Sequence, residues 1–131
     1  MHLNLQVKRF SFTLKKILYT SKGCIREKKG WLLLLTNKDG DYGWGEVSPF
    51  NQLELEECDL ILQRIGNNLS RDMILNNLNI WPNSLSFGFG AAIGELEGTI
   101  GDKTQIGWLN APKSAVLLNS KEDVISQIKY H

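Results

Sequence analysis

The chain has little of several features that would point to a compartment or a charged partner. Its 131 residues include two cysteines, Cys24 and Cys58, without the paired spacing of a disulfide framework. Fifteen basic against fourteen acidic residues leave a net charge of +1, so nothing in the charge favours nucleic acid or an anionic membrane as partner. The longest apolar run, residues 31–35, is far too short to span a bilayer. No secretory signal opens the chain, and we expect a soluble, reduced, cytoplasmic protein.

The usual patterns of catalysis and ligand binding are also missing. His2 and His131 stand at the two ends, and the acids of residues 54–59 share one expected helix start, so no set of oxygen ligands converges on a metal ion. The glycines of residues 88–94 have the wrong spacing for a dinucleotide fingerprint, and no strand is expected before them. No nucleophile has a spaced base and orienting acid. We therefore predict no catalytic residue and no metal ligand in this chain.

Three strands are predicted in the first part of the chain. A change in the phase of the apolar residues near Lys8 and Arg9 predicts a bulge or bend in the first strand. Residues 15–29 read as a long polar connection. Residues 30–36 predict a second strand with both faces covered, because its leucines do not alternate with polar residues. An Asp-Gly turn leads to a third strand at residues 42–47, which gives a three-stranded antiparallel meander.

Helices are predicted to follow the meander. Apolar residues recur at helical spacing from Gln52, and Gly66 marks the end of that helix. Ser70 is the expected cap of a short helix that runs to Leu78. Residues 84–98 predict another helix, although each glycine inside a helix costs about 1 kcal/mol relative to alanine. Its three internal glycines therefore predict that a second backbone packs closely against it: Gly88, Gly90 and Gly94.

The last twenty residues predict one β/α unit. Residues 115–118 form a short, continuously apolar segment of the buried-strand type. Ser120 begins a capping box that opens a final helix. The chain is thus predicted as an α+β protein whose tail starts a β/α repeat. We place the domain boundary after Ala111, with domains at residues 1–111 and 112–131.

Residues 43–50 are the most informative stretch of the sequence, because two glycines bracket Trp44 and a Ser-Pro pair follows. A strand end with a buried Trp44 and a turn at Pro49 explains part of this pattern. It does not explain the flanking glycines, which suggest close approach of another backbone. It also leaves Glu46 unexplained. That residue would face a pocket or pair with a base across a domain interface, and we favour the interface.

The order of several motifs resembles that of a known family. Gly-Trp-Gly-Glu-Val-Ser-Pro at residues 43–49 is followed by Ser-Leu-Ser-Phe-Gly at 84–88, Ala-Ala-Ile-Gly-Glu-Leu at 91–96, Asn-Ala-Pro at 110–112 and Leu-Leu-Asn at 117–119. This order is similar to the N-terminal part of the o-succinylbenzoate synthases of the enolase superfamily, from Leu3 to the end of the chain. The resemblance implies an α+β capping domain followed by a modified (β/α) barrel.

The resemblance also implies a function. It points to a lyase, a dehydratase of menaquinone or phylloquinone biosynthesis, whose barrel carries the catalytic lysines and the acidic ligands of Mg²⁺. The capping domain closes over a small carboxylate substrate with two loops. Carried over to this chain, the first is the mobile loop of residues 21–29, with Arg26 contacting the anionic substrate. Asn119 would end the first barrel strand at the barrel mouth. The second loop consists of Ser48, Pro49, Phe50 and Asn51.

The chain departs from this family in one respect. A (β/α) barrel needs more than about 200 residues, and no Lys-x-Lys barrel strand or acidic metal triad occurs here. We expect a capping domain with one barrel unit, from a fragment or a truncated gene, inactive without its C-terminal barrel partner. Two alternatives stay open: another superfamily member, such as an N-acylamino-acid racemase, a dipeptide epimerase or a muconate cycloisomerase, and a non-catalytic binding or interaction module.

Overall fold

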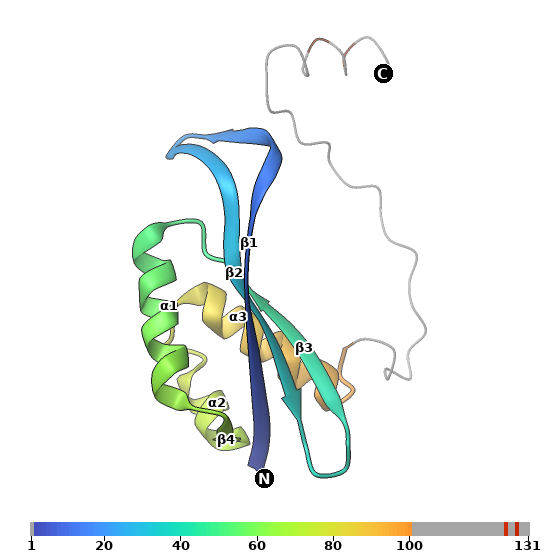
Figure 1. The fold of residues 1–131 in the computed structure, drawn as a ribbon. Helices are drawn as coiled ribbons and strands as arrows, with labels where there is room; N and C mark the ends of the chain where they lie inside the picture. The colour runs from blue at the N-terminus through green and yellow to red at the C-terminus, as the bar shows by residue number, and fades with distance from the viewer. Residues whose placement is uncertain (1, 101–124, 126–127, 129–131) are drawn as a thin grey trace.

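A computed structural model of the chain describes residues 2–100, 125 and 128 (Figure 1). The predicted α+β class is confirmed within these residues. Asn119 and the boundary after Ala111 lie outside them, and so does the proposed domain at residues 112–131 apart from residues 125 and 128. The elements in chain order are β1 (His2–Thr20), β2 (Gly23–Thr36), β3 (Tyr42–Val47), α1 (Gln52–Ile65), β4 (Asn68–Ser70), α2 (Arg71–Asn77) and α3 (Asn83–Leu96).

The strands form one antiparallel sheet in the order β3-β2-β1-β4. The predicted meander of three strands is present, and β4 joins it at the far edge. His2 pairs with Ser70 and Asn4 with Asn68 across the β1–β4 ladder. Three residues are too few to show an alternating pattern, so β4 could not be predicted from the sequence.

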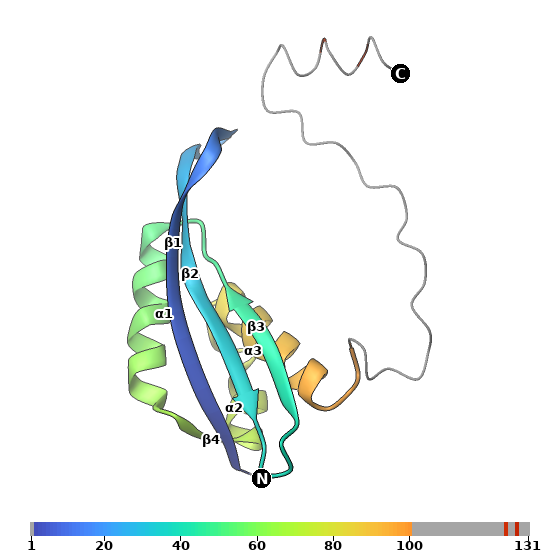
Figure 2. The same ribbon diagram turned by 45° about the vertical axis from the view of Figure 1, so that its right-hand side comes forward.

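The first two strands extend well past the helices as a hairpin arm, residues 14–29 (Figures 1 and 2). The ladder continues to Thr20 opposite Gly23, so the prediction of a long polar connection at residues 15–29 is wrong. These residues are polar because most of the arm has no core to face, while backbone pairing still holds it extended. The irregularity in β1 lies between Thr13 and Leu18, not at the predicted position near residue 8.

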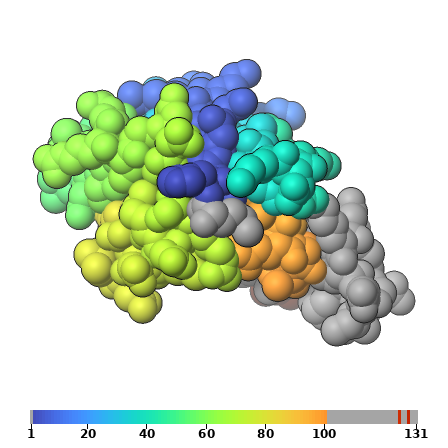
Figure 3. Space-filling model, turned by 90° about the horizontal axis from the view of Figure 1, so that it is seen from below, coloured from blue at the N-terminus to red at the C-terminus, as the bar shows by residue number. Residues whose placement is uncertain are grey.

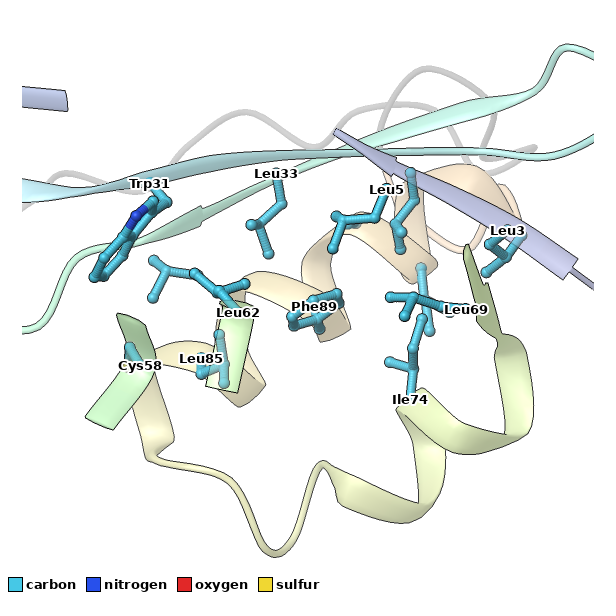
Figure 4. Packing of buried hydrophobic residues seen from close by; sticks show 14 of the residues in the cluster. Leu3, Leu5, Trp31, Leu33, Cys58, Leu62, Leu69, Ile74, Leu85 and Phe89 are labelled. Atoms are coloured by element: carbon cyan, nitrogen blue, oxygen red, sulfur yellow. The ribbon is translucent and has the colours of Figure 1, made fainter. Parts of the chain in front are cut away.

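The helices cover one face of the sheet, and the core lies between the two layers (Figure 4). Leu33 and Leu35 are fully buried on this inner face, whereas Leu32 between them is 37% exposed. The expectation that both faces of the second strand are covered is therefore wrong among the described residues. The buried residues are Leu3, Leu5, Trp31, Leu33, Leu35, Val47, Leu55, Cys58, Leu62, Leu69, Ile74, Leu85, Phe89, Ala92, Ile93 and Leu96.

Strand β3 and helix α3 meet backbone to backbone. A methyl group built on Gly43 would lie 1.8 Å from the carbonyl oxygen of Ala92, and one on Gly45 would lie 1.9 Å from that of Gly88. The predicted close approach of a second backbone is confirmed at Gly88, which meets the Glu46 backbone of β3. It is wrong for the other two glycines of the helix, because Gly90 meets no atom within 4 Å and Gly94 meets only side-chain atoms of Thr99 and Ile100. Because glycines occupy the inner face of β3, Trp44 points outward and is 48% exposed. The expectation of a buried Trp44 is wrong.

Two predicted helix caps are confirmed, Gly66 at the end of α1 and Ser70 at the start of α2, whereas the cap at the start of α1, Asn51, was not predicted. The Asn51 side chain accepts a hydrogen bond from the Glu54 amide at 2.7 Å, and Gly66 ends α1 with a φ of 68°. Ser70 caps α2 by accepting from the Met73 amide at 3.1 Å. Figure 3 shows the end of the molecule away from the arm, where the start of β1 lies between α1 and the β2–β3 turn. Within the described part, no helix is long and apolar enough to cross a membrane.

Candidate functional site

A hollowed region surrounds Phe50, between the hairpin arm and the first residues of α1 and α3. The Phe50 side chain is 76% exposed and lines three hollows of about 340, 500 and 360 Å³. We call this region the Phe50 surface. It is lined by Leu18, residues 20–29, Glu46, residues 48–52, Glu54, Leu55, Ser84 and Phe87.

The first of these hollows joins the two segments that the sequence predicted to cover the substrate. Arg26 borders it from β2, and Pro49, Phe50 and Asn51 border it from the other side. Arg26 and Pro49 are 23 positions apart in the chain, and the fold brings their segments together. The predicted first loop differs in form, because residues 23–29 belong to β2 and only Ser21 and Lys22 form the turn. Arg26 therefore lies on a strand rather than on a loop.

The exposure of Phe50 follows from how its neighbours are held. Val47 ends β3 as a fully buried residue, and Pro49 is buried two positions later. Asn51 is fixed as the cap of α1. With anchors on both sides, the short segment between the strand and the helix turns the Phe50 ring outward. An exposed aromatic held in this way is ready to contact a ligand or another domain without first being ordered.

The third hollow lies beside the end of β3. Its lining includes Ser48 and the exposed ring of Phe87, which comes from the first turns of α3. The Lys28 ammonium lies 2.5 Å from Glu46 Oε1 and 5.8 Å from the centre of the Phe10 ring. Glu46 thus pairs with a lysine on the neighbouring strand, and its contact with a base across a domain interface stays a prediction. This pair was not evident from the sequence, since it depends on the β2–β3 register.

A hydrogen-bonded contact joins the starts of the two long helices beneath the Phe50 surface. The Ser84 hydroxyl donates to Glu54 Oε1 at 2.6 Å, and the Ser84 amide donates to the same oxygen at 3.3 Å. The sequence suggested only a helix-dipole role for Glu54.

Cys58 lies fully buried in α1, and burial raises the pKa of its thiol to about 11. Cys58 is therefore protonated near neutral pH and is not a nucleophile.

The charges around Phe50 leave few cations for a ligand. Lys28 is paired with Glu46, and the Lys29 ammonium lies 3.1 Å from Glu27. Arg26 forms no ion pair with any described residue. A guanidinium beside an exposed aromatic ring suits a ligand that carries both a carboxylate and an apolar group.

The described residues hold no cluster of metal-ligating side chains, and the acids of the Phe50 surface have partners within the chain. No group of three or more His, Cys, Asp or Glu among them could hold a metal ion. The acids that line the Phe50 surface are already engaged: Glu46 with Lys28, Glu27 with Lys29, and Glu54 with Ser84. The arrangement can therefore contact, orient and cover a ligand.

No protein-family model and no curated protein matches the chain. Solved structures do resemble it. A dipeptide epimerase from Methylococcus capsulatus, in complex with Mg and the dipeptide L-Arg-D-Lys, is 21% identical with a TM-score of 0.51. An o-succinylbenzoate synthase from Thermosynechococcus elongatus BP-1, with Mg in the active site, is 22% identical with a TM-score of 0.49. A dipeptide epimerase from Enterococcus faecalis V583 is 22% identical with a TM-score of 0.40.

The fold comparison rests on the M. capsulatus epimerase, whose match covers 76% of this chain and 31% of that protein. The described residues form an α+β domain with the fold of the N-terminal capping domain of enolase-superfamily proteins. The chain spans about a quarter to a third of the length of the synthase and of this epimerase.

Proposed function

We propose that this chain is the substrate-covering domain of an enolase-superfamily enzyme, and that the Phe50 surface faces the substrate. One observation carries this proposal: Arg26 and Phe50, from segments far apart in the sequence, border the same hollow. The capping-domain fold supports it. In this proposal the partner is a C-terminal barrel domain that performs the chemistry, neither nucleic acid nor membrane takes part, and the protein acts in the cytoplasm.

The residues of the Phe50 surface would bind and shield the substrate. The Arg26 guanidinium would donate two parallel hydrogen bonds to a substrate carboxylate, which fixes its orientation. The rings of Phe50 and Phe87, both more than two-thirds exposed, would cover the apolar part of the substrate. Closing these rings over a barrel mouth would exclude water and strengthen the electrostatic interactions inside.

The specific activity that we favour is that of an o-succinylbenzoate synthase-like dehydratase, a lyase of menaquinone or phylloquinone biosynthesis. The order of the sequence motifs supports this choice. So does a hollow that combines the exposed Phe50 ring with the Arg26 guanidinium, which has no ion-pair partner among the described residues. Mg²⁺, when bound, supplies positive charge that favours removal of a proton next to a carboxylate. The described residues offer no site for it, so its ligands would belong to the barrel.

A dipeptide epimerase is the second candidate, because such an enzyme gives the fold match at a TM-score of 0.51. Enzymes of this superfamily share the capping architecture, and the fold does not decide between their reactions. The two candidates differ in the ligand that the Phe50 surface would prefer. An o-succinylbenzoate presents an aromatic ring with carboxylates and no cation, whereas a dipeptide presents an ammonium group besides its carboxylate.

A titration followed by NMR tests the proposal. Addition of o-succinylbenzoate to the ¹⁵N-labelled chain should shift the amide signals of Arg26, Phe50 and Asn51. Arg26→Ala should abolish these shifts, because the only guanidinium on this surface is then lost. Arg64→Ala is the matched control, since Arg64 is also exposed but lies in the last turn of α1.

Each outcome of the titration has a clear meaning. Larger shifts at the same residues with dipeptides than with o-succinylbenzoate would favour the epimerase. Shifts that fall elsewhere, or that persist in Arg26→Ala, would contradict a substrate-facing role of the Phe50 surface. Absence of shifts with both ligands at millimolar concentration would contradict it as well.

A further inference from the structure

The outer face of the sheet carries large apolar side chains that no described element covers, because all three described helices lie on the other face (Figure 2). Leu32 is 37% exposed, Trp44 48% and Phe12 51%. Phe10 and Phe12 stack with their ring centres 5.9 Å apart. Contiguous exposed apolar groups of this size mark an interaction surface in soluble proteins. We call this set, with Leu34, the outer apolar face.

A positive side chain flanks the outer apolar face on its β1 side, and a negative side chain flanks it on its β3 side. Lys8 of β1 pairs in register with Leu32 of β2, which pairs with Glu46 of β3. All three side chains point away from the helices, because residues paired across strands share a face. Neighbouring strands are about 4.8 Å apart, so Lys8 and Glu46 stand on opposite sides of Leu32. Lys8 has no ion-pair partner among the described residues. Glu46 is paired with Lys28 of its own chain through Oε1, so a second lysine would contact its other carboxylate oxygen.

We propose that the outer apolar face binds a second copy of this chain, face to face, about a two-fold axis parallel to the strands and above Leu32. This rotation exchanges the β1 side with the β3 side. It places Lys8 of one copy opposite Glu46 of the other, twice, and Leu32 opposite Leu32. Sheets packed in this way lie about 10 Å apart, a gap that lysine and glutamate side chains can bridge. The surface is self-complementary in charge and shape, as a two-fold interface requires.

The area of the outer apolar face sets the expected affinity of the two copies for each other. Three strands at about 4.8 Å and about eight residues at about 3.3 Å give a face on the order of 400 Å² for each copy. The total of about 800 Å² is below the roughly 1,000 Å² expected of a stable interface, so the dimer is weak, with a dissociation constant in the micromolar range or above. Association must therefore be measured over a series from about 1 μM to about 1 mM.

Sedimentation velocity on the full 131-residue chain provides the first test. The sedimentation coefficient of the wild type should rise with concentration toward that of a dimer. Trp44→Ser should weaken the association by at least about tenfold, since it removes a large apolar side chain from the interface. Leu53→Ser is the matched control, because Leu53 is also apolar and 80% exposed but lies on α1. This control should leave the association unchanged.

A mixing experiment tests the arrangement itself. Lys8→Glu alone and Glu46→Lys alone should each weaken association about tenfold, because like charges then face each other across the two-fold axis. An equal mixture of the two variants should recover wild-type association as a heterodimer, with both facing pairs opposite in sign. The contact between Lys28 and residue 46 within one chain is unchanged by mixing, so recovery reports only the contact between copies.

Circular dichroism confirms that each variant is folded before its association is compared. A wild type that stays monomeric at about 1 mM would overturn the proposal. So would a dimer that Trp44→Ser does not weaken, which would indicate pairing through strand edges or through the helices. Failure of the mixture to recover association would overturn the two-fold arrangement. None of these results depends on the ligand titration of the Phe50 surface.

Discussion

Replacement of Gly45 by alanine should destabilise the fold far more than a single added methyl group usually does. The new Cβ would lie 1.9 Å from the Gly88 carbonyl oxygen and 2.7 Å from the Gly88 carbonyl carbon. Both are backbone atoms, so no side chain can rotate out of the way. An ordinary contact needs about 3.4 Å, and α3 must therefore move away from β3 by more than 1 Å.

The expected loss of stability follows from the side-chain contacts that are loosened when α3 moves away from β3. Burial of a large apolar side chain contributes about 2 kcal/mol, and a gap of 0.5–1 Å removes roughly a quarter to a half of the contact energy. Applied to the four large buried side chains of α3, this gives about 2–4 kcal/mol of lost stability. These side chains are Leu85, Phe89, Ile93 and Leu96.

Gly90→Ala is the matched control, because a methyl group there meets no atom within 4 Å. Alanine is the better helix former, so this variant should gain up to about 1 kcal/mol. Urea unfolding followed by the fluorescence of the buried Trp31 measures both free energies of unfolding. A Gly45→Ala variant within about 0.5 kcal/mol of the wild type would refute the backbone contact between β3 and α3. A destabilised Gly90→Ala would refute the open space at that position.

Three further results are expected. Asn51→Ala should lower the free energy of unfolding by about 1 kcal/mol through loss of the α1 cap, with Asn51→Asp close to the wild type; equal loss in both would contradict the capping role. Ser84→Ala should destabilise by about 1–2 kcal/mol in urea unfolding, because it removes the hydroxyl that donates to Glu54, whereas Ser11→Ala on the exposed part of β1 should not. Burial raises the pKa of Cys58 from 9.0 to about 11, so the folded chain holds this proton more tightly than the unfolded chain. The stabilisation from this neutral thiol is complete below pH 9.0 and falls as the pH rises through about 11. Cys58→Ala should remove that part of the loss of stability in alkaline unfolding curves. An unchanged loss in the variant would refute the contribution of Cys58.

The sequence predicted the helices well because their signals are local. Asn51 at the start of α1, Gly66 at its end and Ser70 at the start of α2 act through their own backbone neighbourhood. The glycines of α3 also predicted a close backbone partner. Its identity as β3 could have been inferred from Gly43 and Gly45, which alternate in the manner of one strand face.

The hairpin arm was missed because apolar alternation reports burial, and most of the arm has no core to bury. Its strands are held by backbone hydrogen bonds, to which every residue type except proline contributes. Trp44 was wrongly predicted to be buried, because large aromatic residues usually are. In β3 the small residues face the helix, and the large one is turned outward.

The candidate site was predicted in part. Arg26 and residues 48–51 were chosen by resemblance. The fold brings Arg26 and residues 49–51 to one hollow, whereas Ser48 lines another. Phe87, the Lys28–Glu46 pair and the Glu54–Ser84 contact could not be found from the sequence. Each depends on strand register or on the placement of two helices that are distant in the chain.

The two sides of the Phe50 surface differ in how strongly they resist displacement. The loop side is joined to a strand whose glycines touch a helix backbone directly, with no side chain between them to be compressed or exchanged. The arm side is a two-stranded ribbon that extends beyond the helices, and two-stranded ribbons bend and open at low free energy. A change in the width of the hollow must therefore come from bending of the arm. Evolution can adjust that width through the arm residues alone, while the position of Phe50 stays fixed by the core.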